Sequence, residues 1–188
     1  QPYALAAGDL PRHFRMGGQL YGRTQDRRRL LQVFEAAARG PVQLVRIAGV
    51  SGIGKTALVT AVRGVLPGLR GNFVAGKFDQ FGQHTPCAAF LQALRQRVRQ
   101  VVAQAPAVRQ GWCEALQAAL QTASGGNAQA ACELVPDLAL LLGPQPEATA
   151  PAAGEPEARF LRTMQQCFMA LASAAEPLVV FIDDLQWA

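Results

Sequence analysis

A glycine-rich stretch over residues 49–56 holds the residue types that could bind phosphate. It runs Gly-Val-Ser-Gly-Ile-Gly-Lys-Thr, a glycine followed after four residues by Gly-Lys-Thr. Glycines let a backbone curl tightly without a Cβ in the way, and successive N–H groups can then point into one concavity. A helix predicted to begin near Lys55 would add the positive end of its dipole. The spacing is that of a complete Walker A motif, and the alternative is a plain glycine-rich turn.

The residues of this loop have expected roles in binding a nucleotide. We expect the Lys55 ammonium to reach the β- and γ-phosphates, where it also serves catalysis, and the Thr56 hydroxyl to hold Mg²⁺. The other contacts are expected from the loop and the first helical turn, namely from Gly49, Ser51, Gly52, Ile53, Gly54 and Ala57.

A second motif lies near the C-terminal end, where the apolar run "LVVFI" is followed by two aspartates. A buried parallel strand delivers a carboxylate at its C-terminal edge, beside a phosphate-binding loop. We therefore expect Asp183 to coordinate Mg²⁺, directly or through water. Asp184 is expected to act as a base or to orient water, and the alternative for it is a bond to a backbone turn. Alone the pattern is weak, but together with the Walker A motif it predicts a Walker B strand.

Composition limits the classes of protein to which the chain can belong. It has 188 residues, half of them apolar, which is enough for one globular domain with a core. The net charge is +5, but the arginines are spread over predicted helices, which favours solvated helix faces over nucleic-acid binding. No apolar run approaches the roughly 20 residues that a membrane span needs.

The cysteines and histidines show no pattern that predicts chemistry. The four cysteines lack the spacing of a zinc site and are expected to be small apolar residues in a reducing compartment, which predicts a cytoplasmic location. His13 and His84 are isolated from each other and from the cysteines, so we assign them no role.

Elements that alternate between apolar strands and amphipathic helices predict an α/β fold. Strands are expected at 42–48, 72–78 and 177–184, and helices at 25–39, 55–62, 86–104, 107–121, 135–142 and 157–174. Residues 1–19 are expected to be a linker into the domain. Residues 143–158, rich in proline, alanine and glycine, are expected to form an exposed, mobile loop.

The motifs in this order resemble the STAND-type AAA ATPase modules of large bacterial signalling proteins. The stretches that carry the resemblance are "LYGRTQDRRRLLQVF", "GVSGIGKTALV", "GKFDQF", "LLLGPQP" and "LVVFIDDLQWA". The resemblance implies a P-loop NTPase of the ASCE type with a three-layer α/β/α core, and ATP with Mg²⁺ as cofactors. It also implies a nucleotide-dependent switch. The implied partners are the kinase, sensor and output domains of the same polypeptide, and further copies of the module on ATP binding.

The resemblance also implies roles for single residues. Lys55 and Thr56 match the phosphate and Mg²⁺ positions, while Asp183 and Asp184 match the Walker B carboxylate and the acid after it. Tyr21, Gly22 and Arg23 match a box that lies beside the nucleotide base in related ATPases, and the alternative is a turn that enters the helix.

The chain departs from the family pattern at two positions and leaves one motif unexplained. Thr24 stands where a glutamate usually follows the arginine, and Cys87 stands where a tyrosine is usual. The stretch from Lys77 to Phe81 matches "KFDQ", for which we derive no role beyond a strand end and a structural turn.

Three functions compete at this point. The first is a regulatory ATPase that switches a multidomain signalling protein by binding and slowly hydrolysing ATP. The second is a nucleotide-binding scaffold or transcription-regulator module that does not hydrolyse ATP. The third is a P-loop phosphotransferase that acts on a small substrate, against which the "YGR" box and the "DDLQWA" ending argue.

The resemblance implies that residues 20–188 are the N-terminal part of such a domain, truncated after the Walker B strand. In the ASCE order the strand with the sensor residue lies between the Walker A and Walker B strands, and it is not in this sequence. Two central strands would then lack a shared neighbour, which leaves backbone groups unpaired. We expect residues 1–188 alone to be poorly stable in a thermal melt. A cooperative transition at high temperature would contradict this expectation.

Overall fold

The computed structural model describes residues 22–79, 87–124, 128–145, 156–173 and 175–188. Its strands are β1 (Asn72–Lys77) and β2 (Leu178–Asp183). Its α-helices are α1 (Thr24–Arg39), α2 (Lys55–Arg63), α3 (Ala88–Val102), α4 (Pro106–Ser124), α5 (Ala128–Leu134), α6 (Ala139–Leu142) and α7 (Pro156–Ala170). Three short 3₁₀ turns lie at η1 (Leu66–Leu69), η2 (Pro136–Leu138) and η3 (Leu185–Trp187). None of the described helices is long and apolar enough to cross a membrane.

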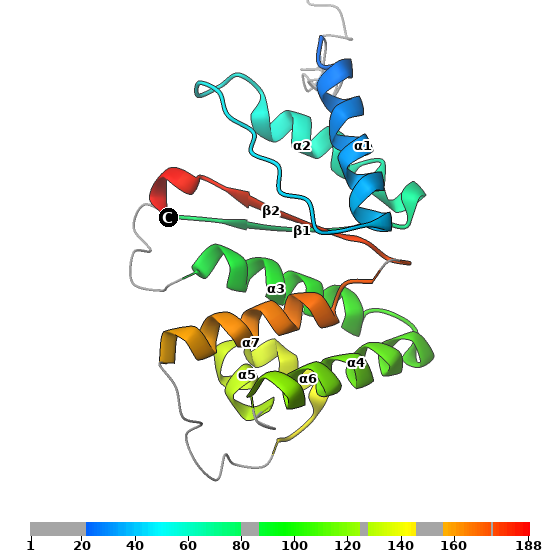
Figure 1. Cartoon of the computed structure of the whole chain (residues 1–188), viewed down its shortest axis with the longest axis vertical. Coiled ribbons are helices and arrows are strands. Elements are labelled where there is room, and N and C mark those ends of the chain that lie inside the picture. The colour runs from blue at the N-terminus through cyan, green and yellow to red at the C-terminus, as the bar shows by residue number, and fades with distance from the viewer. Residues whose placement is uncertain (1–21, 80–86, 125–127, 146–155, 174) are drawn as a thin grey trace, which may run out of the picture.

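The two strands form a small parallel sheet with helices on both sides of it. Helices α1 and α2 lie on one side, and α3 to α7 lie on the other (Figure 1). The register pairs Asn72 with Leu178 at one end and Lys77 with Asp183 at the other. Because the strands are parallel, both carboxyl ends lie at the same edge of the sheet, and Lys77 is placed directly beside the predicted Walker B aspartate.

Most of the buried apolar side chains lie on the α3 side of the sheet. Helix α3 places Leu91, Leu94, Val98 and Val101 on one face, at the spacing of an amphipathic helix. They pack with residues of α4 to α7 and of the segments next to these helices: Leu116, Leu120, Ala131, Val135, Leu138, Leu141, Leu142, Met164, Cys167 and Leu171. A smaller cluster of Phe34, Val62 and Leu66 covers the other side.

The cysteines are free thiols that contribute to this packing, as the sequence predicts. Cys113, Cys132 and Cys167 all belong to the larger cluster or pack against it. Burial raises the pKa of the Cys167 thiol to about 12, so the group is an uncharged apolar side chain at neutral pH.

The outer edge of β1 is covered by three glutamines of α3, which we call the glutamine ladder. In a parallel pair, every second residue turns its N–H and C=O away from the partner strand. The three bonds run from the Lys77 N–H to Gln92 Oε1 (2.9 Å), from the Ala75 N–H to Gln96 Oε1 (2.7 Å), and from Gln100 Nε2 to the Phe73 carbonyl (2.8 Å). The glutamines therefore replace a neighbouring strand and protect β1 from pairing with another edge.

Helix α3 reaches β1 closely enough to make these bonds because Gly76 has no side chain. A Cβ at Gly76 would overlap with the backbone carbonyl of Ala89 near the start of α3. The close approach brings the glutamines within hydrogen-bonding distance of the strand.

A buried arginine joins α3 to the segment that leads into β2. Arg97 is fully buried, and its Nε donates to the Leu171 carbonyl at 2.8 Å. Its guanidinium lies 4.9 Å from the centre of the Trp112 ring, and its Nη2 lies 3.8 Å from the Glu176 carboxylate. Burial lowers the pKa of Arg97, and the nearby Glu176 charge partly opposes that shift.

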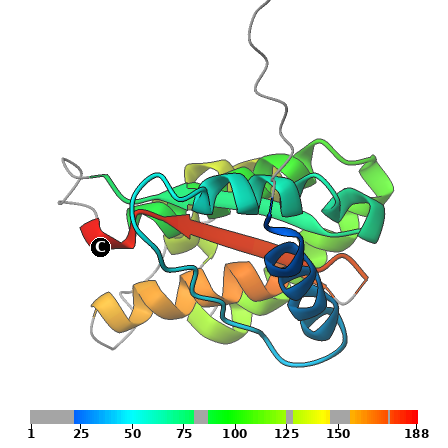
Figure 2. The ribbon, with the colours of Figure 1, turned by 90° about the horizontal axis from the view of Figure 1, so that it is seen from above.

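The predicted strand over residues 42–48 is wrong, because this segment is irregular in the structure. Its side chains Val42 and Leu44 are 84% and 98% exposed. Seen from above, the segment runs alongside β2 before it rises to α2 (Figure 2). In the described part of the chain, no strand pairs with it.

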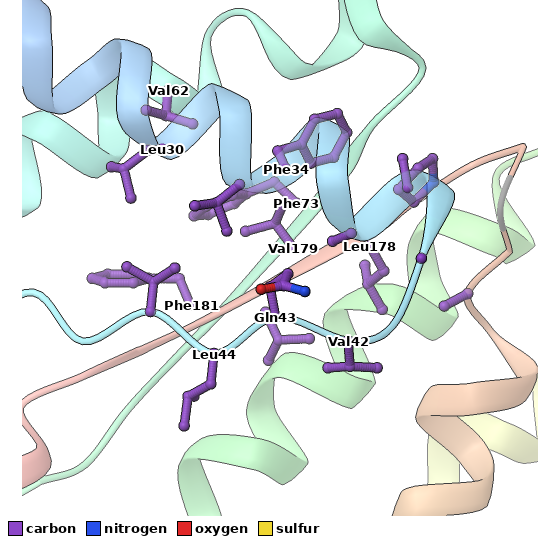
Figure 3. Close-up of a pocket in the computed structure, with 18 of the residues that line it drawn as sticks. Leu30, Phe34, Val42, Gln43, Leu44, Val62, Phe73, Leu178, Val179 and Phe181 are labelled. Carbon is purple, nitrogen blue, oxygen red and sulfur yellow. The ribbon is translucent and has the colours of Figure 1, made fainter.

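A cavity of about 750 Å³ separates the segment 42–48 from β2. Figure 3 shows Val42 and Leu44 on one side of it and Val179 and Phe181 on the other, with Phe34 of α1 above them. An apolar sequence run alone does not make a strand, because the backbone N–H and C=O groups need a partner strand at hydrogen-bonding distance.

The other predicted strands and the longer helices are present, with small shifts at their ends. Helix α1 begins at Thr24, α7 begins at Pro156 within the expected loop, and α5 is a helix that the sequence did not predict. The expected linker 1–19 and residues 146–155 of that loop lie outside the described residues.

We expect Gln96→Ala to destabilise the fold, because the half-buried Ala75 N–H would lose its acceptor. A buried donor without a partner costs about 1–3 kcal/mol. Chemical denaturation would measure the free energy of unfolding, with the exposed Gln117→Ala on α4 as the matched control. Equal effects of the two substitutions would show that the glutamine ladder contributes nothing at this position.

We expect Glu176→Gln to destabilise the fold by about 1–2 kcal/mol. This loss of unfolding free energy is smaller than the loss from breaking a fully buried pair, because the Glu176 side chain is 34% exposed. The amide can still accept the bond that the Asn72 side chain makes to Glu176, so the change removes the charge alone. Chemical denaturation measures the effect, with Glu157→Gln on the exposed start of α7 as the control. A loss of unfolding free energy no larger than that of the control would contradict a stabilising pair between Glu176 and Arg97.

Candidate nucleotide-binding site

The glycine-rich loop over residues 49–54 has an open, curled backbone. Gly52 and Gly54 have φ angles of +77° and +91°, which residues with a Cβ rarely adopt. Apart from atoms of the glycine itself and of the residues directly before and after it, no atom lies within 4 Å of the position that a Cβ would take at either glycine. The loop therefore combines a backbone that requires glycine with free space beside it, and it leads directly into α2.

The Lys55 side chain folds back into the curve of this loop. Its Nζ donates to the carbonyl oxygens of Gly49 at 2.9 Å and Val50 at 3.1 Å. Lys55 is also the first residue of α2, so its cation lies at the positive end of the helix dipole. The arrangement concentrates positive charge and backbone N–H donors at one point, as an anion site requires.

Two oxygen ligands from distant parts of the sequence meet beside the loop. The Thr56 hydroxyl donates to Asp183 Oδ2 at 3.4 Å, and Asp183 Oδ1 accepts the N–H of Asp184 at 3.0 Å. Among the described residues no three His, Cys, Asp or Glu side chains gather as a metal site. The Thr56–Asp183 pair thus resembles a site of the Mg²⁺ type, where the protein supplies one or two oxygens and phosphate and water supply the rest.

The carboxylate of Asp184 is held by two side chains. Its Oδ2 lies 2.9 Å from Lys77 Nζ, and its Oδ1 accepts from Gln186 Nε2 at 3.2 Å. The Lys77 hydrogen bond, with a smaller contribution from Gln186, lowers the pKa of Asp184. The same bond raises the pKa of Lys77, so the two groups are both charged over a wide pH range.

Arg23 connects the start of α1 to the glycine-rich loop. Its Nη2 donates to the Ile53 carbonyl at 3.0 Å, and its Nη1 lies 3.1 Å from the Asp26 carboxylate. Arg23 was expected near the nucleotide base, and the structure brings its guanidinium to the loop backbone at Ile53. Tyr21, which was expected beside it, lies outside the described residues.

Most of the expected site residues lie together at the carboxyl edge of the sheet. Asp183 is the last residue of β2, and Asp184 follows it. The residues in or next to the loop are Gly49, Ser51, Gly52, Ile53, Gly54, Lys55, Thr56 and Ala57. Lys77 was missed as a member of this group. The sequence did contain a sign of its place: Lys77 lies near the end of a predicted strand, and parallel strands in one sheet end at the same edge. Gln80 and Phe81 of the same motif lie outside the described residues.

Comparisons with known proteins agree with this arrangement. The family model of the AAA ATPase domain matches residues 19–188. The chain is 27% identical over 186 residues to a hybrid signal transduction histidine kinase G of Dictyostelium discoideum. That match covers 99% of this chain and 5% of the relative, so the chain spans a small part of that protein. No solved structure matches the chain. Since the family model covers most of the sequence, the chain belongs to the AAA ATPase domain family.

Proposed function

We propose that the chain is the ATP-binding module of a signal-transduction protein and works as a slow, Mg²⁺-dependent ATPase switch. The observation that carries the proposal is the convergence of the Lys55 loop with the Thr56–Asp183 oxygen pair. The relative's printed name supports the signalling role, and the family supports ATP as the nucleotide. The proposed partners are other domains of the same polypeptide. The helices on both sides of the sheet support the proposed three-layer core.

The residues present fit ATP and Mg²⁺. The space beside Gly52 and Gly54 leaves room for phosphate against backbone N–H groups. The Thr56 hydroxyl and the Asp183 carboxylate are the hard oxygen ligands that Mg²⁺ prefers. When bound, Mg²⁺ would neutralise charge on the phosphates and so ease transfer of the terminal one.

Within this proposal each charged residue has a separate task. Lys55 exchanges the Gly49 and Val50 carbonyls for β- and γ-phosphate oxygens, and these bonds are stronger because both partners carry charge. Thr56 and Asp183 hold the metal. Asp184 takes a proton from the attacking water, whose oxygen bonds to the γ-phosphorus while the bridging P–O bond breaks, leaving ADP and phosphate.

A module that binds ATP without hydrolysing it is the second candidate. One observation favours it: both oxygens of the Asp184 carboxylate already accept hydrogen bonds, from Lys77 and from Gln186. A base in that state has to be released before it can take a proton.

We expect Lys55→Ala to weaken Mg-ATP binding by about 10- to 100-fold, because hydrogen bonds to charged phosphates are lost. Asp184→Asn should keep binding and reduce phosphate release about 100-fold or more, because the amide cannot accept a proton. Calorimetry for binding and a phosphate-release assay for turnover check the two expectations. Glu35→Gln, in an exposed pair on α1, is the control for loss of a carboxylate.

Unchanged binding in Lys55→Ala would contradict the nucleotide site. Tight binding with no phosphate release in the parent or in any variant would favour the non-hydrolysing module. Transfer of phosphate to an added small acceptor would favour the phosphotransferase.

A further inference from the structure

The start of helix α1 is held in place relative to α2, the helix that follows the glycine-rich loop. The two helices lie side by side (Figure 1), and Phe34 of α1 is buried together with Val62 of α2. The chain turns into α1 at Gly22, whose φ is +76°, and the Arg23 carbonyl accepts the N–H of Arg27 at 3.0 Å. The backbone of Arg23 is therefore fixed at the point from which its side chain reaches the loop.

The Arg23 guanidinium bridges α1 and the loop. Its Nη2 donates to the Ile53 carbonyl at 3.0 Å, while its Nη1 lies 3.1 Å from Asp26 Oδ2. Because the guanidinium is planar, two partners on different nitrogens fix its orientation as well as its position. The first α2 N–H that bonds to a carbonyl of the described residues is that of Leu58, to Gly54 at 3.0 Å. The Ile53 carbonyl lies one residue before that bond and takes its partner from α1.

This bond decides which way the peptide between Ile53 and Gly54 faces. The peptide is trans, so its C=O and N–H point in opposite directions. With the carbonyl bonded to Arg23, the Gly54 N–H is directed away from the guanidinium. Glycine adopts positive and negative φ about equally well, so the backbone around Gly52 and Gly54 has alternatives that other residues lack. The Arg23 bond selects one of them.

Stability of the fold does not account for this bridge. The side chains of Arg23 and Asp26 are 31% and 50% exposed, and exposed ion pairs add little to folding free energy. A loop that binds phosphate through backbone N–H groups, in contrast, depends on the direction of each peptide. The bridge therefore matters for binding an anion and is nearly indifferent for the fold.

We propose that Arg23 is a positioning residue for phosphate: it holds the Ile53–Gly54 peptide so that the Gly54 N–H can donate to a phosphate oxygen before a nucleotide arrives. The proposal rests on the proposed function, in which this loop binds the phosphates of ATP. It replaces the expectation that Arg23 contacts the base, because the guanidinium acts on the loop backbone. Donors that are already oriented lower the cost of ordering the site on binding.

Binding of two ligands tests this role: Mg-ATP, and inorganic tripolyphosphate with Mg²⁺, which has neither base nor ribose. Arg23→Met keeps an unbranched side chain and removes the guanidinium. Both Kd values should rise by the same factor, about 3- to 10-fold, the range set by one hydrogen bond. Arg39→Met, which breaks an exposed pair with Glu35 on α1, is the matched control and should leave both Kd values unchanged. Calorimetry measures binding, and chemical denaturation should give both variants the same free energy of unfolding.

Salt separates a bond to the loop from the effect of a distant positive charge. Ions screen charges that lie further apart than the Debye length, which is only a few ångströms at about 0.5 M salt. The ratio of the Kd of Arg23→Met to that of the parent should therefore persist at this salt concentration, although both Kd values rise. A merely structural residue would not change the two ligands by one common, salt-resistant factor.

The outcomes separate this proposal from the proposed function. Equal Kd values in Arg23→Met and the parent overturn the positioning role, and so does a loss that salt removes. A loss confined to Mg-ATP also overturns it and assigns Arg23 to the base. Tripolyphosphate that fails to bind a parent that binds Mg-ATP contradicts a loop already arranged for phosphate. A parent that binds neither ligand refutes the proposed function itself, and the positioning role with it.

Discussion

The parallel register between β1 and β2 is the constraint on which the arrangement of charges depends. It sets Lys77 beside Asp183, and a slip of one residue would turn the Lys77 side chain to the opposite face of the sheet. Two strands alone hold a register weakly, and the surrounding helices compensate for this. The glutamine ladder bonds the outer edge of β1, while the buried Arg97 bonds the segments next to β2. The helices on the α3 side thus contribute to the site through the strands that they align.

The sequence predicts the parts of the site whose chemistry is local. The loop, the start of α2 and the acids at the end of β2 each follow from residue type and spacing within about ten residues. Strands β1 and β2 and helix α3, which carries the glutamines, also follow from their patterns of apolar residues. Gln92, Gln96 and Gln100 recur at every fourth position on an arginine-rich helix, which was a visible sign of one polar stripe. Its partner, a strand backbone, was not visible in the sequence.

The parts that sequence analysis missed depend on partners far away in the chain. The run 42–48 is apolar enough for a strand, but a strand exists only where another backbone bonds to it, and a cavity lies on the β2 side. Arginines are common on exposed helix faces, so nothing local distinguishes the buried Arg97 from its exposed neighbours on α3. Lys77 has the same difficulty: its ionic partner Asp184 lies more than a hundred residues later in the chain.

The two lysines of the chain differ in what they would gain from a bound phosphate. Lys55 now bonds to neutral carbonyl oxygens, so exchange for charged phosphate oxygens strengthens its hydrogen bonds. Lys77 already bonds to a carboxylate, and it would give up one charged partner to obtain another. Within the proposed function, arrival of the nucleotide therefore changes the contacts of Lys55 much more than those of Lys77. In that proposal, contact of the nucleotide with the loop does not by itself free the Asp184 carboxylate from its bonds to Lys77 and Gln186.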